Sequence, residues 1–144
     1  METQNYSNHK QIVVSFHRVL LPILGLTIIG AGVNLYQSIG DHQRLYSASL
    51  ILVLSACVVA MSLFARLFAL RAQDRGIRVE ENLRHYVLTG KLLDSRLSVP
   101  QIVALRFASD GEFPALAARA VAENLSNDDI KKSVKDWRAD THRV

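Results

Sequence analysis

The fold is decided by residues 45–90, LYSASLILVLSACVVAMSLFARLFALRAQDRGIRVEENLRHYVLTG. The first 21 positions of this stretch contain no charged residue, whereas charged residues recur from Arg66 onward. A helix needs about 20 apolar residues to cross the roughly 30 Å hydrocarbon core of a bilayer. The stretch therefore predicts a transmembrane helix over 45–68 that continues as a cytosolic stalk helix over 69–90.

Two glycines bear on the course of this stalk. Gly90 follows Thr89, and glycine readily adopts the left-handed conformation that ends many helices, so we expect the stalk helix to end there. Gly76 lies inside the stalk and disfavours helix by about 1 kcal/mol relative to alanine, which makes it a candidate bend.

Another uncharged run, 22 residues from Val19 to Gly40, lies before residues 45–65 in the chain. It is longer than the apolar part of a signal peptide, about 7–15 residues, and another apolar run follows at once. We therefore predict a transmembrane helix over 19–39, with Pro22 in its first turn, and an outer turn over 40–44. Lipid offers no partners for backbone N–H and C=O groups, so both spans should be helical and form an antiparallel hairpin.

Lysine and arginine are unevenly distributed around the two runs. Two of these basic residues precede the uncharged run 19–40, and four follow the uncharged run 45–65, between Arg66 and Arg78. The connection between the two runs contains only Arg44. Positive residues near span ends are retained on the cytosolic side. This predicts two cytosolic termini, with residues 1–18 as an N-terminal segment and residues 91–144 as a helical cap.

Small and weakly polar residues mark the faces through which the two spans are expected to pack. Such residues let membrane helices approach closely, and they recur here at spacings of four or seven. Packing within one hairpin and association between copies both fit this pattern. The predicted packing residues are Gly25, Thr27, Ala31, Gly32, Asn34, Ala56 and Ala60.

The cap contains three helix starts, each with a serine whose hydroxyl can accept from an unpaired N–H of the first turn. Acidic residues in two of these turns also suit the helix dipole. The predicted helices start at Ser98, Ser109 and Ser126 and end near Ala108, Asn124 and Arg138.

Helices this short are not stable alone in water, so we expect them to pack on one another with the stalk as a fourth element. Apolar residues at helical spacing indicate the buried faces. They are Ile102, Leu105, Phe107, Phe113, Leu116, Ala120, Val121, Ile130, Val134 and Trp137.

Composition and spacing argue against several classes of function. The chain from Arg66 onward contains 14 Lys+Arg and 11 Asp+Glu, a mixture unlike the basic stripe of a nucleic-acid binder. The single cysteine, Cys57, cannot by itself form an intramolecular disulfide or a metal site. Capping explains the acidic pairs at helix starts. No nucleophile–base arrangement or phosphate-binding loop is recognisable. We therefore expect neither enzyme activity nor a cofactor.

Several short motifs are distributed along the chain: QNYSNH (4–9), Phe16-His17, RLFALRAQDR (66–75), Ile77-Arg78, Glu80-Glu81, LRFASD (105–110), IKK (130–132) and WRAD (137–140). Together these motifs resemble a bacterial family of small two-span membrane proteins of unknown function. The resemblance implies a bacterial cytoplasmic membrane location but no activity and no catalytic residues.

The stalk and cap contain many polar residues that no recognisable chemistry explains. We therefore predict a non-enzymatic scaffold or accessory subunit that binds a protein partner or a second copy of itself. Two alternatives are an oligomeric pathway for ions or small molecules, and a haem-binding module through His17, which lies eight residues after His9. The predicted interaction surface comprises Arg71, Gln73, Asp74, Arg75, Arg78, Glu80, Glu81, Arg106 and Asp110.

Overall fold

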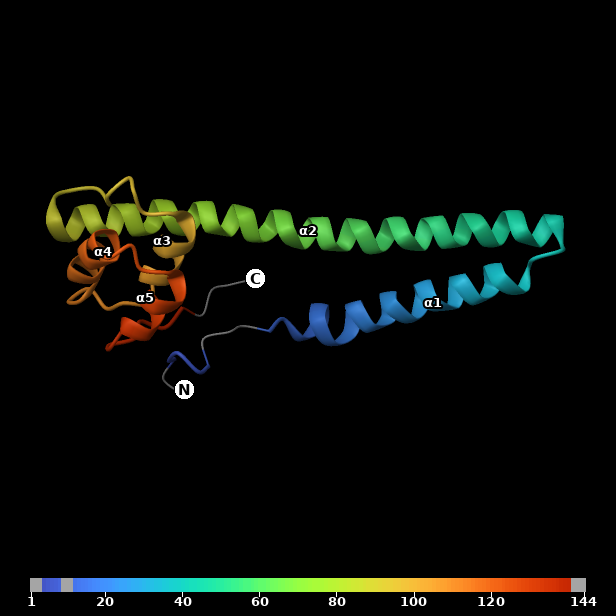
Figure 1. Cartoon of the computed structure of the whole chain (residues 1–144), viewed down its shortest axis with the longest axis horizontal. Coiled ribbons are helices and arrows are strands. Elements are labelled where there is room, and N and C mark those ends of the chain that lie inside the picture. The colour runs from blue at the N-terminus through green and yellow to red at the C-terminus, as the bar shows by residue number, and fades with distance from the viewer. Residues whose placement is uncertain (1–3, 9–11, 141–144) are drawn as a thin grey trace. The chain divides into compact units, whose positions relative to one another are not determined.

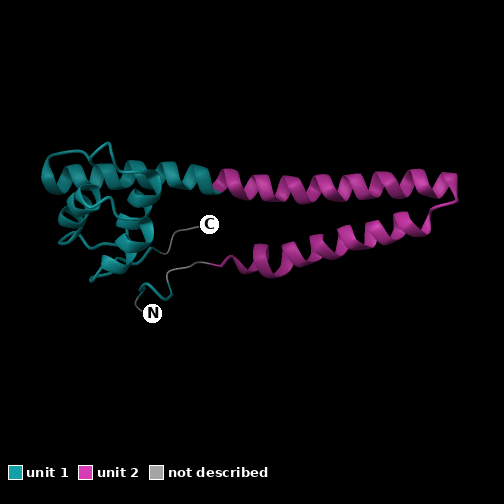
Figure 2. Cartoon of the chain, viewed as in Figure 1, with its two compact units in different colours: residues 1–11, 70–144 teal, residues 12–69 magenta. Residues whose placement is uncertain are grey.

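The computed structural model describes residues 4–8 and 12–140, and every regular element in these ranges is helical, which confirms the all-α prediction. The described residues form two compact units, 12–69 and 4–8 with 70–140, shown in Figure 2. The elements, labelled in Figure 1, are a π-helical segment (Ser15–Leu20), α1 (Leu21–Gln37), α2 (His42–Thr89), α3 (Val99–Leu105), α4 (Phe113–Ala122) and α5 (Asn127–Ser133).

The first long helix begins earlier than predicted, at Ser15. Its opening turns are π-helical, and the N–H of Leu21 donates to the carbonyl of Phe16. Pro22 follows directly; it lacks an N–H, and its ring crowds the carbonyl four residues earlier. The wider π-helical turn makes room for that ring. Pro22 therefore lies within a continuous helix rather than in its first turn.

Within residues 12–69, α1 and the first part of α2 each have one side that is partly or fully covered. The most covered positions are Ala31 and Ala48, whose small side chains allow close approach. The covered sides repeat every three or four residues, as a helix face must. They comprise Leu24, Gly25, Ile28, Ala31, Gly32 and Leu35 of α1, and Leu45, Ala48, Ser49, Leu52, Ser55, Val59 and Ser62 of α2.

The covered faces differ in part from the predicted packing residues. Spacing identifies a helix face, but it does not say which face is covered. The Thr27 hydroxyl donates to the carbonyl of Ile23 at 2.8 Å, so its polarity is satisfied within its own helix. Of the predicted residues, Gly25, Ala31 and Gly32 lie on the covered side, and Thr27, Asn34, Ala56 and Ala60 are exposed.

In the unit of residues 70–140, α2 continues through Gly76 without a break and ends at Thr89. Gly90 follows with φ +73°, as predicted for a glycine that terminates a helix. The chain then turns back along α2, where the N–H of Leu93 donates to Asn82 Oδ1 at 3.0 Å. In the same loop, the guanidinium and backbone N–H of Arg96 lower the pKa of Asp94 to about 2.

Two of the three predicted cap-helix starts are confirmed. The Ser98 N–H donates to Gln101 Oε1 at 2.8 Å in a capping box that opens α3. The Ser126 hydroxyl accepts from the N–H of Asp129 at 3.1 Å and opens α5. Both devices are local, since each joins residues three apart in sequence.

The start predicted at Ser109 is wrong, because α4 begins at Phe113. The carboxylate of Glu112 does not close a capping box with Ser109. It accepts from the backbone N–H groups of Lys135 and Asp136 at 3.2 and 3.1 Å. The Glu112 carboxylate thus binds backbone groups more than twenty residues away instead of the local N–H groups of a capping box.

The third cap helix ends earlier than predicted, at Ser133, and the chain after it is extended. Ala108 and Trp137 form an antiparallel bridge. The N–H of Arg138 donates to the carbonyl of Phe107 at 2.7 Å, and the N–H of Ser109 donates to the carbonyl of Asp136 at 3.0 Å. These bonds satisfy backbone groups that another helical turn would otherwise have paired.

The cap has one hydrophobic core, and every apolar residue predicted for it belongs to it or packs against it. The rings of Phe107 and Trp137 lie with centroids 5.0 Å apart. The core comprises Leu97, Ile102, Ala104, Leu105, Phe107, Ala108, Phe113, Leu116, Ala117, Ala120, Ile130 and Val134, flanked by Leu93, Val121, Leu125 and Trp137.

Candidate functional site

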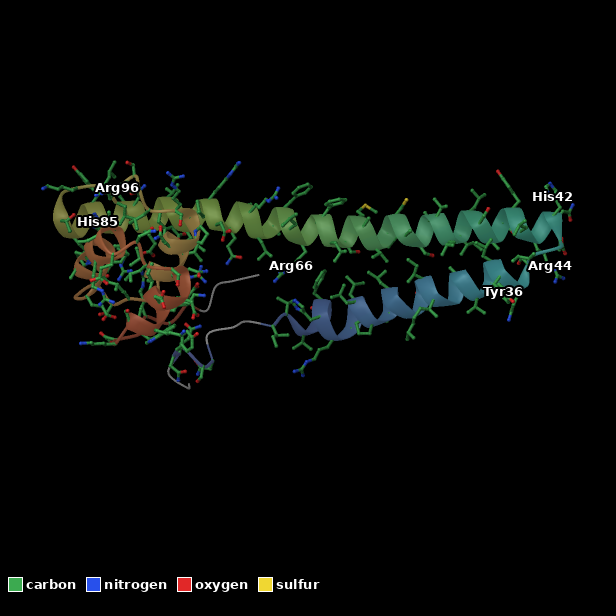
Figure 3. All side chains as sticks on the ribbon, in the orientation of Figure 1. Tyr36, His42, Arg44, Arg66, His85 and Arg96 are labelled. Atoms are coloured by element: carbon green, nitrogen blue, oxygen red, sulfur yellow. The ribbon has the colours of Figure 1, made fainter. Side chains whose placement is uncertain are left out.

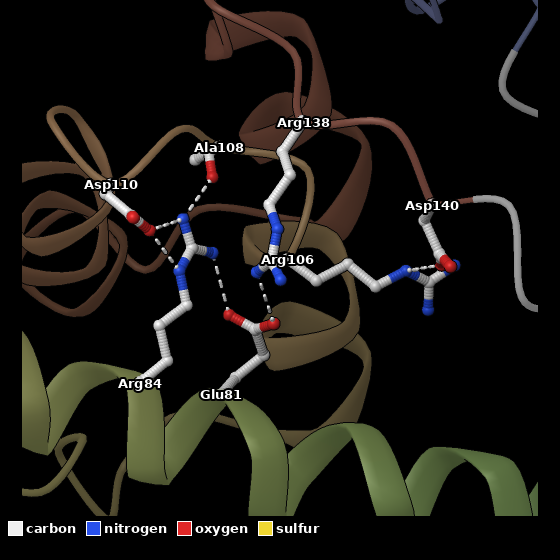
Figure 4. Close-up of polar contacts among 7 residues, drawn as sticks. All are labelled: Glu81, Arg84, Arg106, Ala108, Asp110, Arg138 and Asp140. Atoms are coloured by element: carbon white, nitrogen blue, oxygen red, sulfur yellow. Dashed lines mark hydrogen bonds and ion pairs between the residues drawn. The ribbon is translucent and has the colours of Figure 1, made fainter.

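The guanidinium of Arg84 is the centre of a polar cluster between α2 and the cap (Figure 4). Nη1 donates to Glu81 Oε2 at 3.0 Å, Nε donates to Asp110 Oδ1 at 2.7 Å, and Nη2 donates to the carbonyl of Ala108 at 2.7 Å. The face of the guanidinium lies 4.4 Å from the centroid of the Phe113 ring. One side chain of α2 thus contacts the α3–α4 connection and the first residue of α4.

The cluster is buried on the α2 side and open on the other. The side chains of Arg84 and Glu81 are 11% and 6% exposed, whereas that of Asp110 is 69% exposed. Glu81 and Arg84 are three residues apart on one helix, so they lie on the same face. Charges this buried are stable only when they are paired and hydrogen-bonded, as they are here.

A second ion pair, between the cap and the C-terminal segment, lies beside the first (Figure 4). Arg106 Nε is 2.7 Å from Asp140 Oδ2, and the Arg106 guanidinium lies 4.6 Å from the centroid of the Phe107 ring. Arg138 also contacts the first cluster, since its Nη1 is 3.6 Å from Glu81 Oε1.

A cleft of about 400 Å³ opens between these charges. Its walls contain carboxylates and guanidinium groups that already pair with one another, so the cleft suits polar or charged groups of a partner. Among the described residues, no group of three or more His, Cys, Asp or Glu side chains is placed to hold a metal ion. The cleft is lined by Gln73, Gly76, Ile77, Glu80, Glu81, Arg106, Arg138, Ala139 and Asp140.

The predicted interaction residues fall into three groups. Glu81, Arg106 and Asp110 belong to the intramolecular ion pairs, and Gln73 and Glu80 line the cleft. The remaining residues follow α2 toward its apolar part, with Asp74 half-buried and Arg71, Arg75 and Arg78 exposed.

Sequence reasoning missed Arg84, Arg138 and Asp140 as members of the cluster. Arg84 pairs with Glu81 on its own helix and with Asp110, which lies far from it in sequence. Arg138 and Asp140 stand in the WRAD motif, which drew attention to them but gave no partner.

The sequence profile of a family of unknown function, DUF6526, matches residues 1–144. The chain belongs to DUF6526. No curated protein and no solved structure matches it. Family membership thus supplies no activity, and any function for this DUF6526 chain has to be argued from its own geometry.

The N-terminal segment of the DUF6526 chain contacts the cap. The Tyr6 hydroxyl donates to Asp128 Oδ1 at 2.7 Å, and Lys132 Nζ lies 2.6 Å from Asp128 Oδ2 and 5.6 Å from the centroid of the Tyr6 ring. The Asp140 N–H donates to Gln4 Oε1 at 2.8 Å. Residues that precede the first long helix therefore lie against residues that follow the second.

These contacts shift the pKa values of three side chains. Hydrogen bonds from Lys132, which has the larger effect, and from Tyr6 lower the pKa of Asp128. The hydrogen bond to Asp128 raises the pKa of Tyr6, and the same carboxylate raises the pKa of Lys132.

His17, the residue proposed for haem, has Nδ1 3.0 Å from the carbonyl oxygen of Val13 and its ring edge-on to Phe16. The contact with Val13 involves Nδ1 of the His17 ring. His9 lies outside the described residues.

The Arg84 cluster predicts a large effect from a single substitution. Arg84→Ala leaves the buried Glu81 carboxylate with only the distant Arg138, so we expect a loss of about 3 kcal/mol in the free energy of unfolding of the cap. Denaturant titration of the full chain in detergent, followed by the fluorescence of Trp137, measures this loss. The double variant Glu81→Met/Arg84→Met removes both charges and should recover most of it.

Arg96→Ala is the matched control. Arg96 also pairs with an aspartate, Asp94, but its side chain is 74% exposed, so its removal should leave the free energy of unfolding almost unchanged. Equal losses for Arg84→Ala and Arg96→Ala would show that the buried cluster has no special role.

The contact between Tyr6 and Asp128 should weaken at both extremes of pH. The folded pKa of Asp128 lies below its usual 3.8, so its contribution is present above 3.8 and is lost as pH falls through the folded value. The folded pKa of Tyr6 lies above its usual 10.0, so its contribution is present below 10.0 and is lost as pH rises through the folded value.

Substitution of Tyr6 tests this assignment. Tyr6→Phe removes one of the two hydrogen bonds that favour the Asp128 carboxylate, so the pKa of Asp128 should rise toward 3.8. Carboxyl-detected NMR titration measures the change. Tyr86→Phe, on α2, serves as the control and should leave the Asp128 titration unchanged; an unchanged titration in Tyr6→Phe contradicts the contact.

Proposed function

We propose that this DUF6526 chain is an integral membrane protein whose two long helices anchor a cytosolic, non-enzymatic docking module. The observation that carries the anchor is the exposure of large apolar side chains on all sides of both helices except the covered stripes. Both helices are long and apolar enough to cross a membrane, with mean hydropathy of 1.9 over the most apolar part of Ser15–Gln37 and 2.5 over that of His42–Thr89. In water such surfaces would drive aggregation.

The polar groups of the apolar stretches also suit a lipid environment. The hydroxyls of Thr27, Ser55 and Ser62 each donate to the carbonyl of the residue four earlier in their own helix. Lipid cannot supply these partners, so internal satisfaction is what a spanning helix requires.

Residues at the ends of the apolar stretches suit the lipid–water boundaries. Figure 3 shows Tyr36, His42 and Arg44 at the connection between α1 and α2, and Arg66 at the other end of the apolar part of α2. Tyrosine and arginine are enriched at such boundaries.

The contacts of the N-terminal segment support the proposed topology. Gln4 and Tyr6 touch residues of the cap, which requires the segment before the first helix and the cap after the second to lie on one side. Two crossings give that arrangement. The excess of Lys and Arg on that side favours the cytosol, and the family resemblance favours the inner membrane of a bacterium.

The docking role is supported by the surface of the module. The stretch of α2 over residues 71–80 presents exposed Arg71, Arg75, Arg78 and Glu80, and the adjacent cleft is lined with charged groups. Such a surface suits binding of a protein through charge-assisted hydrogen bonds.

A pathway for ions or small molecules has less support. Thr27 and Asn34 are exposed, whereas Ser55 and Ser62 lie on the covered side of α2, so these polar residues do not share one face. For the haem-binding alternative, the contact of His17 Nδ1 with the carbonyl of Val13 leaves Nε2 open, as in many metal-ligating histidines, and does not by itself favour haem.

Labelling of single cysteines tests the topology. In a Cys57→Ala background, Gln43→Cys, at the connection between the helices, should react with a membrane-impermeant maleimide applied to intact spheroplasts. Lys135→Cys, in the cap, should react only after permeabilisation. Both positions are exposed, so equal access to reagent is expected without a membrane. Labelling of both positions from the same side contradicts the two-span hairpin.

Photo-cross-linking in the membrane tests the docking role. A photoreactive amino acid in place of Arg78, on the exposed stalk, should give discrete protein adducts in cells, and mass spectrometry of the adducts identifies the bound protein. The same residue in place of Glu123, exposed at the end of α4, should give none. The docking role fails if the Arg78 position gives no adduct or the same adducts as position 123.

A further inference from the structure

We propose that a second copy of the chain binds the outer face of α2 over residues 72–86, so that two stalks form a short parallel coiled coil. The inference rests on the proposed function in one respect, because insertion in one membrane gives the two stalks the same direction.

The outer face of the stalk exposes large apolar side chains outside the predicted span. Val79, Leu83 and Tyr86 are 68%, 61% and 54% exposed. With Asn82 and Leu92 they line an apolar hollow of about 400 Å³. A contiguous apolar surface of this kind marks an interaction site more often than an isolated exposed leucine does.

The spacing of this face fits a two-stranded coil. Ala72, Gly76, Val79, Leu83 and Tyr86 follow one another at intervals of four, three, four and three residues. In heptad terms Gly76 and Leu83 are at a, and Ala72, Val79 and Tyr86 are at d. The small residues at 72 and 76 allow the backbones to approach at the end nearer the apolar part of α2.

The cap leaves this face accessible. The side of α2 that contacts the cap contains Ile77, Glu81 and Arg84. At 100° per residue, Val79 points to the opposite side of the helix, and Leu83 lies between that side and the cap-facing side. A Cβ added at Gly76 would meet no atom within 4 Å, so the described chain leaves that position open.

Two flanking charges select a copy of the same helix in parallel orientation. In this register Arg75 is at g and Glu80 is at e, and in a parallel coil each g residue meets the e residue five positions later on the partner. Each Arg75 would therefore face the Glu80 of the other copy, and twofold symmetry makes two such pairs. In an antiparallel coil, g faces g and e faces e, so like charges would meet.

Both charges are available for this contact. Arg75 and Glu80 are exposed, and neither forms an ion pair within the part of the chain that the structure describes. The coil covers only about two heptads and would be marginal for free peptides. Confinement in a membrane raises the effective concentration of the second stalk and compensates for the short contact.

Disulfide trapping in native membranes tests the proposal. In a Cys57→Ala background, Val79→Cys at a d position should form an intermolecular disulfide under mild oxidation, because d residues of a parallel coil approach within the roughly 4–7 Å between Cα atoms that a disulfide needs. Arg78→Cys, at the exposed preceding residue but off the seam, should not form this disulfide. Equal trapping of both variants, or trapping of neither, overturns the proposal.

Charge reversal tests the register. Arg75→Glu and Glu80→Arg should each lower the dimer association constant on the order of tenfold at low salt, since each turns two attractive pairs into repulsive ones. The double variant Arg75→Glu/Glu80→Arg should restore trapping at Val79→Cys. Failure of the double variant to restore it, with the cap still folded by Trp137 fluorescence, overturns the parallel register.

Carbonate extraction of the same membranes separates this proposal from the proposed function. Chain that stays in the membrane but is not trapped leaves the anchor intact and overturns the dimer. Chain that is extracted by carbonate but still traps at Val79→Cys refutes the anchor and supports the contact between copies. A mixed disulfide of Val79→Cys with a different protein overturns the second copy as the occupant.

Discussion

The arrangement of the cap depends on how the Arg84 guanidinium is satisfied. The group is nearly buried, and a buried charge without partners is strongly destabilising. Glu81 on the same helix, Asp110 and the Ala108 carbonyl supply the hydrogen bonds, and the Phe113 ring covers one face. These partners come from α2, the α3–α4 connection and the first residue of α4, so the α3–α4 connection must lie where it does. The helix α2 is thereby fixed against the cap by directed polar bonds as well as by apolar contact.

The sequence predicted those features that local interactions decide. The Ser98 and Ser126 caps and the Gly90 terminus each involve residues within three or four positions of one another, and each formed where it was expected. The Ser109 cap failed because the Glu112 carboxylate binds backbone N–H groups of residues 135 and 136. The end of α5 was missed for the same reason. Residues after Ser133 pair with residues near Ala108, which no local pattern reveals.

The candidate site was predicted as a set of residues but not as a geometry. Glu81, Arg106 and Asp110 were singled out as polar residues without an evident role, yet their partners inside the chain remained hidden. Asp110 lies 26 residues from Arg84, and Asp140 lies far from Arg106 in sequence, so spacing could not join them. Polarity in the spans was misleading in another way. A hydroxyl such as that of Thr27 bonds to its own helix and therefore does not identify the face that another helix covers.

The stalk inverts the usual distribution of side chains on an amphipathic helix. Its covered side contains Glu81 and Arg84 beside Ile77, whereas Val79, Leu83 and Tyr86 are exposed away from it. An isolated helix in water gains nothing from this arrangement, since each exposed apolar side chain forgoes about 1.5–3 kcal/mol of burial. The inversion makes sense if the outer side is itself buried in the working state. Because Arg75 and Glu80 flank the seam at the spacing at which two copies of one helix complement each other, a second stalk satisfies both the apolar side chains and the charges.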